Sequence, residues 1–158
     1  MALRDMTEDD LDMLFDIQDD DVAQHMAAFV NPNGLAREDY RAKWRTILAR
    51  EDTTNKVIEL DGEVVGSIGA FVLEGDTEVT YWIRRDMWGR GLATAALAEL
   101  LRVVTVRPIW ASAAADNVGS ATVLMRNGFE SVGERTGFAA ARGAEVEELV
   151  FRLDEPSA

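Results

Sequence analysis

The sequence has 158 residues, the length of one average domain, so we expect a single domain over residues 1–158 without a separate cofactor domain. Hydrophobic residues make up 47% and charged residues 28%, and zero cysteines with one histidine exclude disulfide scaffolds and thiolate or multi-histidine metal sites. The net charge of −13 disfavours nucleic-acid and anionic-membrane partners; it favours a cationic partner, although acidity also serves solubility alone.

The first half of the chain is expected to form a strand, two helices and an antiparallel meander. Thr7 is a suitable N-cap, and the spacing of Leu11, Leu14 and Phe15 predicts a helix to about residue 18. A second helix is predicted over residues 37–50. Alternating β-branched and aromatic residues between glycine turns predict strands, the last of them central and buried. The predicted strands of this half are residues 2–6, 56–60, 63–73 and 78–84.

The second half is expected to form a strand-helix-strand unit and a closing strand. Apolar residues at spacings of three and four predict a helix over residues 91–104, and a further helix is predicted over residues 118–126. Strands are predicted at residues 108–115, 129–134 and 146–153. The fold class is therefore mixed α/β (α+β), with a largely antiparallel sheet of about seven strands flanked by about four helices.

The most informative segment is Trp88-Gly89-Arg90-Gly91-Leu92-Ala93-Thr94, between a predicted strand and a predicted helix. Its two glycines let backbone N–H groups and the positive helix end approach a phosphate. Arg84, Arg85 and Arg90 add three cations to an otherwise acidic chain. We predict an anion-binding turn, the alternative being a plain glycine turn with solvated arginines. The spacings of P-loops and of dinucleotide-binding loops are absent.

A second segment, Asp116-Asn117-Val118-Gly119-Ser120, begins the last predicted helix, and Asn127-Gly128-Phe129 ends it. Asn117 is a good helix N-cap, and Asn127-Gly128 is typical of a helix stop. Ser120 lies about one turn inside the helix. Taken alone, this segment indicates only helix capping.

In this order the two segments resemble the GNAT superfamily of acyl-CoA-dependent N-acetyltransferases. The family signature, which is Gln or Arg, two residues, Gly, one residue, then Gly or Ala, resembles Trp88 to Ala93, with Trp88 departing from it. The run from Tyr81 to Gly91 resembles the ribosomal-protein N-terminal acetyltransferases, in which an aromatic residue at this place is common. Asn117, Ser120 and Gly128-Phe129 match the second family motif. The expected element order fits from Leu3 to Leu153.

The resemblance implies that an amine attacks the thioester carbonyl of acetyl-CoA and that coenzyme A leaves. It implies that the Ile83 N–H faces the developing oxyanion, that Ser120 donates to the leaving thiolate, and that Asn117 binds the coenzyme arm. The pantetheine arm would lie along Trp82, Ile83 and Arg84. The backbone N–H groups implied to hold the pyrophosphate are those of Gly89, Arg90, Gly91, Leu92, Ala93 and Thr94.

Two departures leave the proton transfers open. Some relatives carry a tyrosine proton donor where this chain has Leu124, and a glutamate base where it has Ser112. The group that deprotonates the amine is therefore left among four candidates, which are Glu78, Asp116, His25 and ordered water. A solvated charge is the alternative for each carboxylate, and a capping or surface role is the alternative for His25.

By analogy with the family, acceptor specificity is expected in residues 19–36 and in residues 135–145, which join the last two strands. The loop Asn31-Pro32-Asn33-Gly34 lies in the first of these segments. Phe29, Trp44 and Phe138 are candidate walls of the acceptor pocket, core packing being the alternative. An acidic run without a base could attract a cationic amine, or form a solvated helix face. Its members are Asp5, Glu8, Asp9, Asp10, Asp12, Asp16, Asp19, Asp20 and Asp21.

The sequence thus predicts an N-acetyltransferase that uses acetyl-CoA without a metal and acts on a primary amine. The acceptor is left open among a protein N-terminus, a small amine such as a polyamine or amino acid, and an amine antibiotic. One alternative is a catalytically silent acyl-CoA-binding or regulatory module, and another is a structural domain that binds no coenzyme. Because no signal-peptide pattern or membrane-length apolar stretch occurs, we expect a cytoplasmic protein. The acidic net charge predicts no nucleic-acid or membrane partner, and a monomer and a homodimer are both left open.

Overall fold

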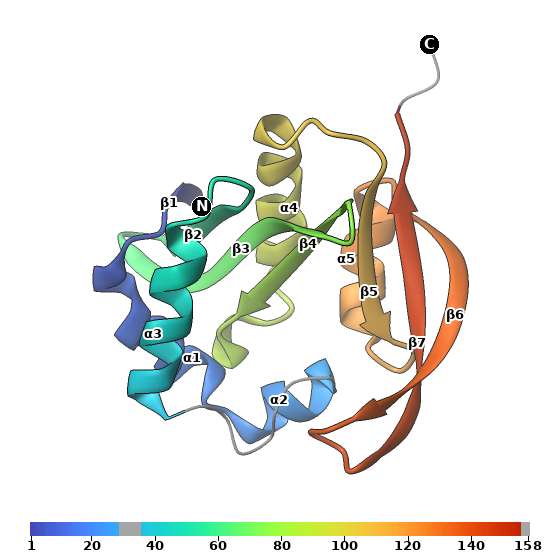
Figure 1. Cartoon of the computed structure of the whole chain (residues 1–158), viewed down its shortest axis with the longest axis horizontal. Coiled ribbons are helices and arrows are strands. Elements are labelled where there is room, and N and C mark those ends of the chain that lie inside the picture. Colours follow the sequence, from blue (N-terminus) through green and yellow to red (C-terminus); the bar gives the residue numbers. More distant parts are fainter. Residues whose placement is uncertain (29–35, 156–158) are drawn as a thin grey trace.

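Seven strands form one sheet in the order β1-β2-β3-β4-β5-β7-β6 (Figure 1). The computed structural model describes residues 1–28 and 36–155. Every neighbouring pair is antiparallel except β4 and β5, which are parallel. This arrangement confirms the mixed, largely antiparallel sheet expected from the alternating pattern. The strands are β1 (Ala2–Asp5), β2 (Thr54–Leu60), β3 (Glu63–Leu73), β4 (Asp76–Ile83), β5 (Ile109–Ala114), β6 (Glu130–Ala139) and β7 (Ala144–Leu153).

Five α-helices occur in the described residues, one more than the four expected. A 3-10 turn over Glu8–Asp10 precedes the first of them. The additional helix is α2, where the sequence predicted only a loop. Three successive aspartates and the lack of an apolar stripe hid it, yet the Asp20 carboxylate caps it by accepting the Ala23 N–H at 2.9 Å. The helices are α1 (Leu11–Gln18), α2 (Asp21–Ala27), α3 (Arg37–Leu48), α4 (Leu92–Val103) and α5 (Val118–Arg126).

The helices cover the two faces of the sheet separately (Figure 1). On one face, Leu14 of α1 and Tyr40 of α3 pack with Val57 of β2. On the other face, Leu97 of α4 and Leu124 of α5 belong to the larger core. A strand sends successive side chains to opposite faces, so β2 contributes to both cores. No helix in the described ranges is long and apolar enough to cross a membrane.

Two predicted features differ from the structure. Residues 135–145 were expected to join the last two strands, but β6 continues to Ala139 and β7 starts at Ala144. Polar residues occupy both faces of this edge hairpin, and they hide the period of two on which strand prediction depends. Strand β4 is central, as predicted, but only Val79 and Ile83 of it are buried. The second half of β4, from Val79 to Ile83, borders a cleft.

Candidate functional site: a cleft between two diverging strands

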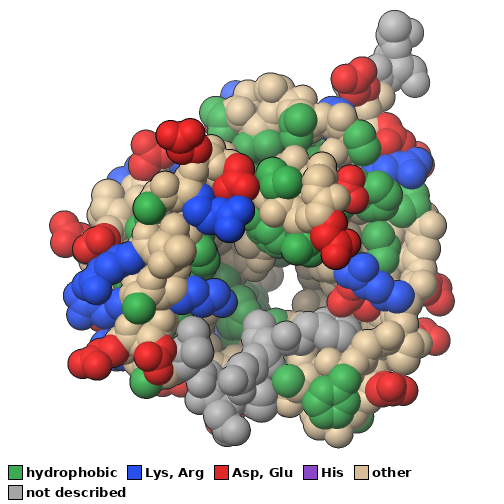
Figure 2. All heavy atoms as spheres, viewed as in Figure 1, with side chains coloured by type: hydrophobic (Ala, Val, Ile, Leu, Met, Phe, Trp, Pro, Cys, Tyr) green, Lys and Arg blue, Asp and Glu red, His purple; other side chains and the backbone are tan. Residues whose placement is uncertain are grey.

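The cleft exists because β4 and β5 pair over only two residues each. Thr77 lies opposite Ile109 and Glu78 opposite Trp110, and beyond this point the strands separate. The separation leaves a cavity of about 1150 Å³, which is lined by β4, β5 and residues of α1, α2, α3, α4 and α5. Figure 2 shows it as an opening through the middle of the molecule. The cleft is therefore open to solvent.

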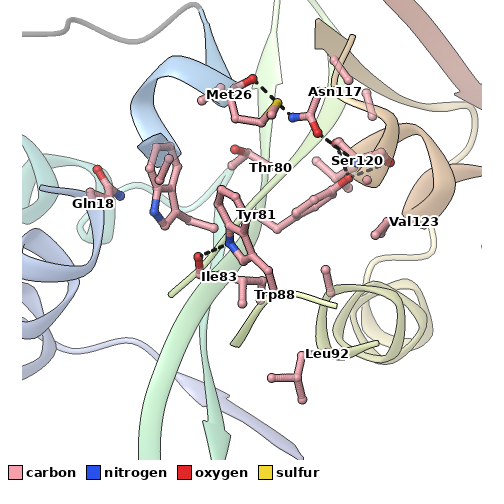
Figure 3. A pocket seen from close by; sticks show the side chains of 18 of the residues that line it. Gln18, Met26, Thr80, Tyr81, Ile83, Trp88, Leu92, Asn117, Ser120 and Val123 are labelled. Carbon is pink, nitrogen blue, oxygen red and sulfur yellow. Dashed lines mark hydrogen bonds between the residues drawn. The ribbon is translucent and has the colours of Figure 1, made fainter. Parts of the chain in front are cut away.

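One edge of β4 faces this cleft with its backbone. The Arg84 N–H donates to the Val65 carbonyl at 2.8 Å, which points the backbone of Arg84 toward β3. Because backbone N–H and C=O groups point alternately to the two edges of a strand, those of Trp82 also point toward β3, whereas those of Tyr81 and Ile83 point toward the cleft. The Ile83 carbonyl accepts the Trp88 indole N–H at 2.9 Å, in agreement with this assignment (Figure 3). The Ile83 N–H is therefore directed into the cleft.

The turn after β4 ends in the exposed N-terminus of α4. Gly89 and Gly91 adopt φ of 77° and 75°, a conformation that L-residues with a side chain rarely adopt. A Cβ at either glycine would meet nothing within 4 Å, so the backbone conformation rather than space requires glycine. The first helical bond of this end runs from the Ala95 N–H to the Gly91 carbonyl at 3.1 Å. The N–H groups of Leu92, Ala93 and Thr94 precede it and present a partial positive charge.

The arginines near this turn do not converge on the cleft. Arg84 forms ion pairs with Glu63 at 2.7 Å and with Asp86 at 2.6 Å, and it does not line the cavity. Arg85 lies 3.2 Å from Asp20. Arg90 is exposed beside the turn. The anion-binding capacity of this segment therefore depends on backbone N–H groups more than on the guanidinium groups.

Tyr81 and Ser120 meet across the cleft (Figure 3). The Tyr81 hydroxyl lies 2.6 Å from the Ser120 Oγ and 3.2 Å from the Ser120 carbonyl oxygen. Burial raises the pKa of Tyr81 to about 12, against the opposing effect of its hydrogen bond to Ser120, so the phenol stays protonated at neutral pH. The two sequence motifs did not include Tyr81. Its alternation with the buried Val79 and Ile83 was the available signal, since it places all three on the face toward α5.

Asn117 caps α5 and also binds α2. Its Oδ1 accepts the Ser120 N–H at 3.2 Å, and its Nδ2 donates to the Met26 carbonyl at 3.4 Å. One Nδ2 hydrogen remains for a ligand in the cleft. The structure thus brings Asn117 and Ser120 together beside β4, as the spacing of the second motif requires.

The predicted base candidates lie outside the cavity lining. Glu78 is half-buried where β4 and β5 part, and burial raises its pKa while nearby Arg135 lowers it. Asp116 forms an ion pair with Arg142 at 2.5 Å, which lowers the Asp116 pKa. His25 lies on α2, and its backbone carbonyl accepts the Arg142 Nε–H at 2.9 Å. Ser112 does line the cavity.

Helix α2 closes the open end of the cleft (Figure 1). From its middle the Gln24 side chain donates to the carbonyl of Gln18, the last residue of α1, at 2.9 Å. At its C-terminus the Ala28 carbonyl accepts the Ala141 N–H at 3.1 Å, from the turn between β6 and β7. The helix therefore spans from the β4 side to the β5 side of the opening.

The two predicted specificity segments contribute unequally. Asp19 and four residues of α2 line the cavity, whereas no residue of 135–145 does. Trp44 lines it, but the Phe138 side chain points to solvent and is 63% exposed. Phe29 and the loop Asn31-Pro32-Asn33-Gly34 lie outside the described residues.

The sequence and the fold were compared with those of known proteins. A sequence model of the acetyltransferase (GNAT) domain matches residues 1–130. No match was found among the curated proteins.

Several solved structures are similar. A ribosomal-protein-alanine N-acetyltransferase from Brucella melitensis is 25% identical with a TM-score of 0.83, covering 98% of this chain and 100% of that one. Mycobacterium smegmatis RimJ in complex with CoA-disulfide is 25% identical with a TM-score of 0.75, covering 96% and 80%. The spermidine N-acetyltransferase from Vibrio cholerae in complex with CoA and spermine is 13% identical with a TM-score of 0.84, covering 97% and 94%, and it shows the fold alone.

Proposed function

Because the chain belongs to the acetyltransferase (GNAT) domain family, we propose that it transfers the acetyl group of acetyl-CoA to a primary amine by direct attack in a ternary complex. We also propose that residues 1–158 act as one domain in the cytoplasm. The observation that carries the proposal is the continuous backbone surface of the cleft. It runs from the free edge of β4 to the glycine turn and the N-terminus of α4.

The coenzyme would bind mainly through backbone groups. Its pyrophosphate would occupy the turn formed by Gly89, Arg90 and Gly91 and the N–H groups of Leu92, Ala93 and Thr94, where the helix dipole favours an anion. Its pantetheine amides would pair with the free edge of β4 beside Trp82 and Ile83. Arg84 supports this site by holding the end of β4 against β3, with its backbone N–H donating to Val65. The remaining N–H of Asn117 faces the same arm.

The Ile83 N–H is placed to stabilise the transition state. When the amine nitrogen bonds to the thioester carbon, the carbonyl π electrons move to oxygen and create an oxyanion. A backbone donor aimed at that oxygen stabilises the transition state more than the ground state. The Trp88 indole holds the Ile83 carbonyl at 2.9 Å, which fixes this part of β4 relative to the glycine turn. Trp88, the departure from the family signature, thus acquires a structural role.

Collapse of the tetrahedral intermediate breaks the carbon–sulfur bond and leaves a thiolate. A thiol pKa of about 8.5 makes this a tolerable leaving group, and a hydroxyl donor assists it further. We assign this donor to Ser120. If Tyr81 donates its proton to the Ser120 Oγ, at 2.6 Å, the Ser120 hydrogen is free to point to the sulfur. Tyr81 is then a positioning residue for Ser120 in a chain that has Leu124 where some relatives carry a tyrosine.

The attacking amine must also lose a proton. We propose that Glu78 accepts it through solvent, because it stands on β4 at the junction of the cleft and burial raises its pKa. The reactive form is the carboxylate, so the rate should rise with pH through this raised pKa. Replacing Glu78 with Gln should remove that limb of the pH profile, whereas an unchanged limb would assign the step to another group.

The test of the proposal is release of thiol from acetyl-CoA in the presence of an amine, with the acetylated amine identified by mass spectrometry. A panel should hold free amino acids, polyamines, aminoglycosides and peptides with a free N-terminus. Amine-dependent thiol release with one acetyl group added per product supports the proposal. Thiol release that is independent of every amine, or no release at all, would contradict it.

A further inference from the structure

An aromatic wall borders the cleft on the side of α1 and α3. It consists of Phe15, Tyr40, Trp44 and Trp82, which all line the cavity and pack in one cluster. The Phe15 and Tyr40 rings meet edge to face with centroids 5.3 Å apart, and those of Tyr40 and Trp44 are 6.1 Å apart. We call these four residues the acceptor wall, because they lie on the face of β4 opposite Tyr81 and Ser120. Their apolar faces suit an apolar group.

Two polar atoms of the acceptor wall have no hydrogen-bond partner among the described residues. Tyr40 is only 5% exposed, and its hydroxyl is buried without a partner. The Trp82 Nε1 is buried in the same condition. Buried polar groups are nearly always paired, and an indole N–H can only donate. The acceptor wall therefore holds two donors that an oxygen atom of a ligand could use. Because both donor atoms are covered, a ring of the acceptor wall must rotate before a ligand reaches them.

The charges at the cleft favour an anion on this side. Only three charged residues in the described ranges line the cavity, and they are Asp19, Lys43 and Arg126. Lys43 precedes Trp44 on α3, and it has no ion-pair partner among the described residues. Lys43, Tyr40 and Trp82 all line the same cavity, and an ammonium together with two unused donors is complementary to a carboxylate.

The acidic run, in contrast, does not form a cation-binding surface in the cleft. Most of its members are occupied elsewhere: Asp5 lies 2.5 Å from Lys56, Asp16 lies 2.6 Å from Arg37, and Asp20 pairs with Arg85. Asp19 is the only acid of the run that lines the cavity. A polyamine would therefore meet one carboxylate and one ammonium here, and its repeated cations would lack partners.

From this arrangement we propose that the acceptor is a free amino acid with an apolar side chain, an inference that rests on the proposed acetyl transfer. Its carboxylate would bind Lys43, Tyr40 and Trp82, and its side chain would pack on Phe15 and Trp44. Its amine would then face the thioester near the Ile83 N–H. Helix α2 closes the end of the cleft, which favours a small acceptor over the N-terminus of a folded protein.

The test compares acceptors that differ only in the carboxylate. Thiol release is measured with each of the twenty L-amino acids, with the decarboxylated amine of the best one, with spermidine and with an alanine tripeptide. The proposal expects kcat/KM for the best amino acid to exceed that of its decarboxylated amine, spermidine and the tripeptide by at least about tenfold. It is overturned if any of these three acceptors equals the best amino acid, or if coenzyme binds and no amino acid is acetylated.

Two variants separate carboxylate recognition from a general structural effect. Tyr40→Phe keeps the ring, and Lys43→Met keeps the aliphatic stem. Each should raise KM for the amino acid about tenfold and leave KM for the decarboxylated amine within twofold. Lys56→Met, which breaks an ion pair on β2 away from the cleft, is the matched control and should change neither. Equal effects on both acceptors, or none, would overturn the assignment.

Acetyl-CoA binding distinguishes the failure of this inference from the failure of the proposed function. Thermal unfolding with and without acetyl-CoA should show the same coenzyme-induced shift in Tyr40→Phe, Lys43→Met and the unaltered chain. A shift together with preferred acetylation of spermidine overturns the amino-acid acceptor and leaves acetyl transfer intact. The absence of both a shift and amine-dependent thiol release overturns acetyl transfer itself, and the acceptor assignment with it.

Discussion

Gly66 on β3 is the residue whose replacement tests the placement of the oxyanion donor. It lies opposite Ile83 in the β3–β4 pairing. A Cβ on Gly66 would stand closer than 3.0 Å to the Trp82 carbonyl oxygen and 3.2 Å from the Ile83 Cα. The Trp82 carbonyl and the Ile83 N–H belong to the same planar peptide unit. Gly66→Ala must therefore push this peptide away from β3 and tilt the N–H that faces the cleft.

The size of the effect follows from the role of that N–H. Loss of one oxyanion donor costs about 2.7–4 kcal/mol, or 10²–10³ in kcat. A tilted donor keeps part of this interaction, so we expect kcat to fall about tenfold to a hundredfold, which is about 1.4–2.7 kcal/mol. Overpacking should also lower the free energy of unfolding by about 1–3 kcal/mol. The dissociation constant for acetyl-CoA should rise by a smaller factor than kcat falls, because the displaced peptide borders only the pantetheine arm and the pyrophosphate site in the glycine turn is separate from this contact.

Gly69→Ala is the matched control. Its Cβ would also stand closer than 3.0 Å to a carbonyl oxygen, but that oxygen belongs to Thr54 on β2, away from the cleft. Steady-state kcat of both variants should be measured well below their unfolding midpoints. We expect similar losses of stability and a loss of kcat in Gly66→Ala only. A kcat within twofold of the unaltered chain in Gly66→Ala, or an equal fall in both variants, would refute the assignment of the Ile83 N–H.

Three further predictions concern the Tyr81–Ser120 pair, the glycine turn and the buried Asp10. Tyr81→Phe and Ser120→Ala should each lower kcat about threefold to tenfold without changing the dissociation constant for acetyl-CoA. The double variant should be no slower than Ser120→Ala, and additive losses of kcat would show that the two hydroxyls act separately. Gly91→Val should weaken acetyl-CoA binding at least about tenfold in titration calorimetry, because valine disfavours a φ of 75°. The control Gly62→Val, at a φ of 81° in the β2–β3 turn, should leave binding unchanged, and equal affinities in the two variants would remove the turn at Gly91 from the coenzyme site. Hydrogen bonds from the Arg4 guanidinium lower the pKa of the buried Asp10, so the stabilisation it supplies is present above the unfolded pKa of about 3.9 and is lost as pH falls toward the lower folded pKa. Asp10→Asn should reduce the free energy of unfolding in urea by about 1.5–3 kcal/mol at pH 7 and flatten the decline of that free energy below pH 4, and an unchanged decline would contradict this.

The sequence predicted the elements whose patterns are local. The β2–β3 hairpin follows from alternating residues around Asp61-Gly62, both of which adopt positive φ. The glycine turn and the start of α4 follow from the same kind of local signal, because Gly91 adopts positive φ at the helix N-terminus. The second motif also predicted the pairing of Asn117 with the start of α5. These features depend on backbone preferences that a few adjacent residues determine.

Features that depend on distant partners were beyond reach of the sequence. The cluster Arg84, Arg85 and Arg90 looked like one cationic patch, but Glu63 and Asp20 each hold one of its members elsewhere. The contact of Tyr81 with Ser120 joins residues 39 positions apart. The alternation along β4 assigns Tyr81 to the same face as Val79 and Ile83, but the position of α5 over that face cannot be read from spacing within one segment.

Helix α2 illustrates a further limit. Its sequence, Asp-Val-Ala-Gln-His-Met-Ala, has no amphipathic stripe, and a seven-residue helix is marginal in isolation. Contacts at both ends stabilise it: the Asp20 carboxylate accepts the Ala23 N–H at the start, and near the end Arg142 and Asn117 donate to the carbonyls of His25 and Met26. Tertiary contacts therefore supply what local propensity does not, in the element that closes the cleft.

Thermal unfolding with and without acetyl-CoA shows whether the cleft between β4 and β5 binds the coenzyme. At a concentration one hundred times its dissociation constant, a ligand that binds only the folded state adds about 2.7 kcal/mol to the free energy of unfolding. For a chain of this length that raises the midpoint by about 5–11 °C. We expect this rise of the unfolding midpoint in the unaltered chain and its loss in Gly91→Val. An unchanged midpoint at millimolar acetyl-CoA would contradict a coenzyme site in the cleft between β4 and β5.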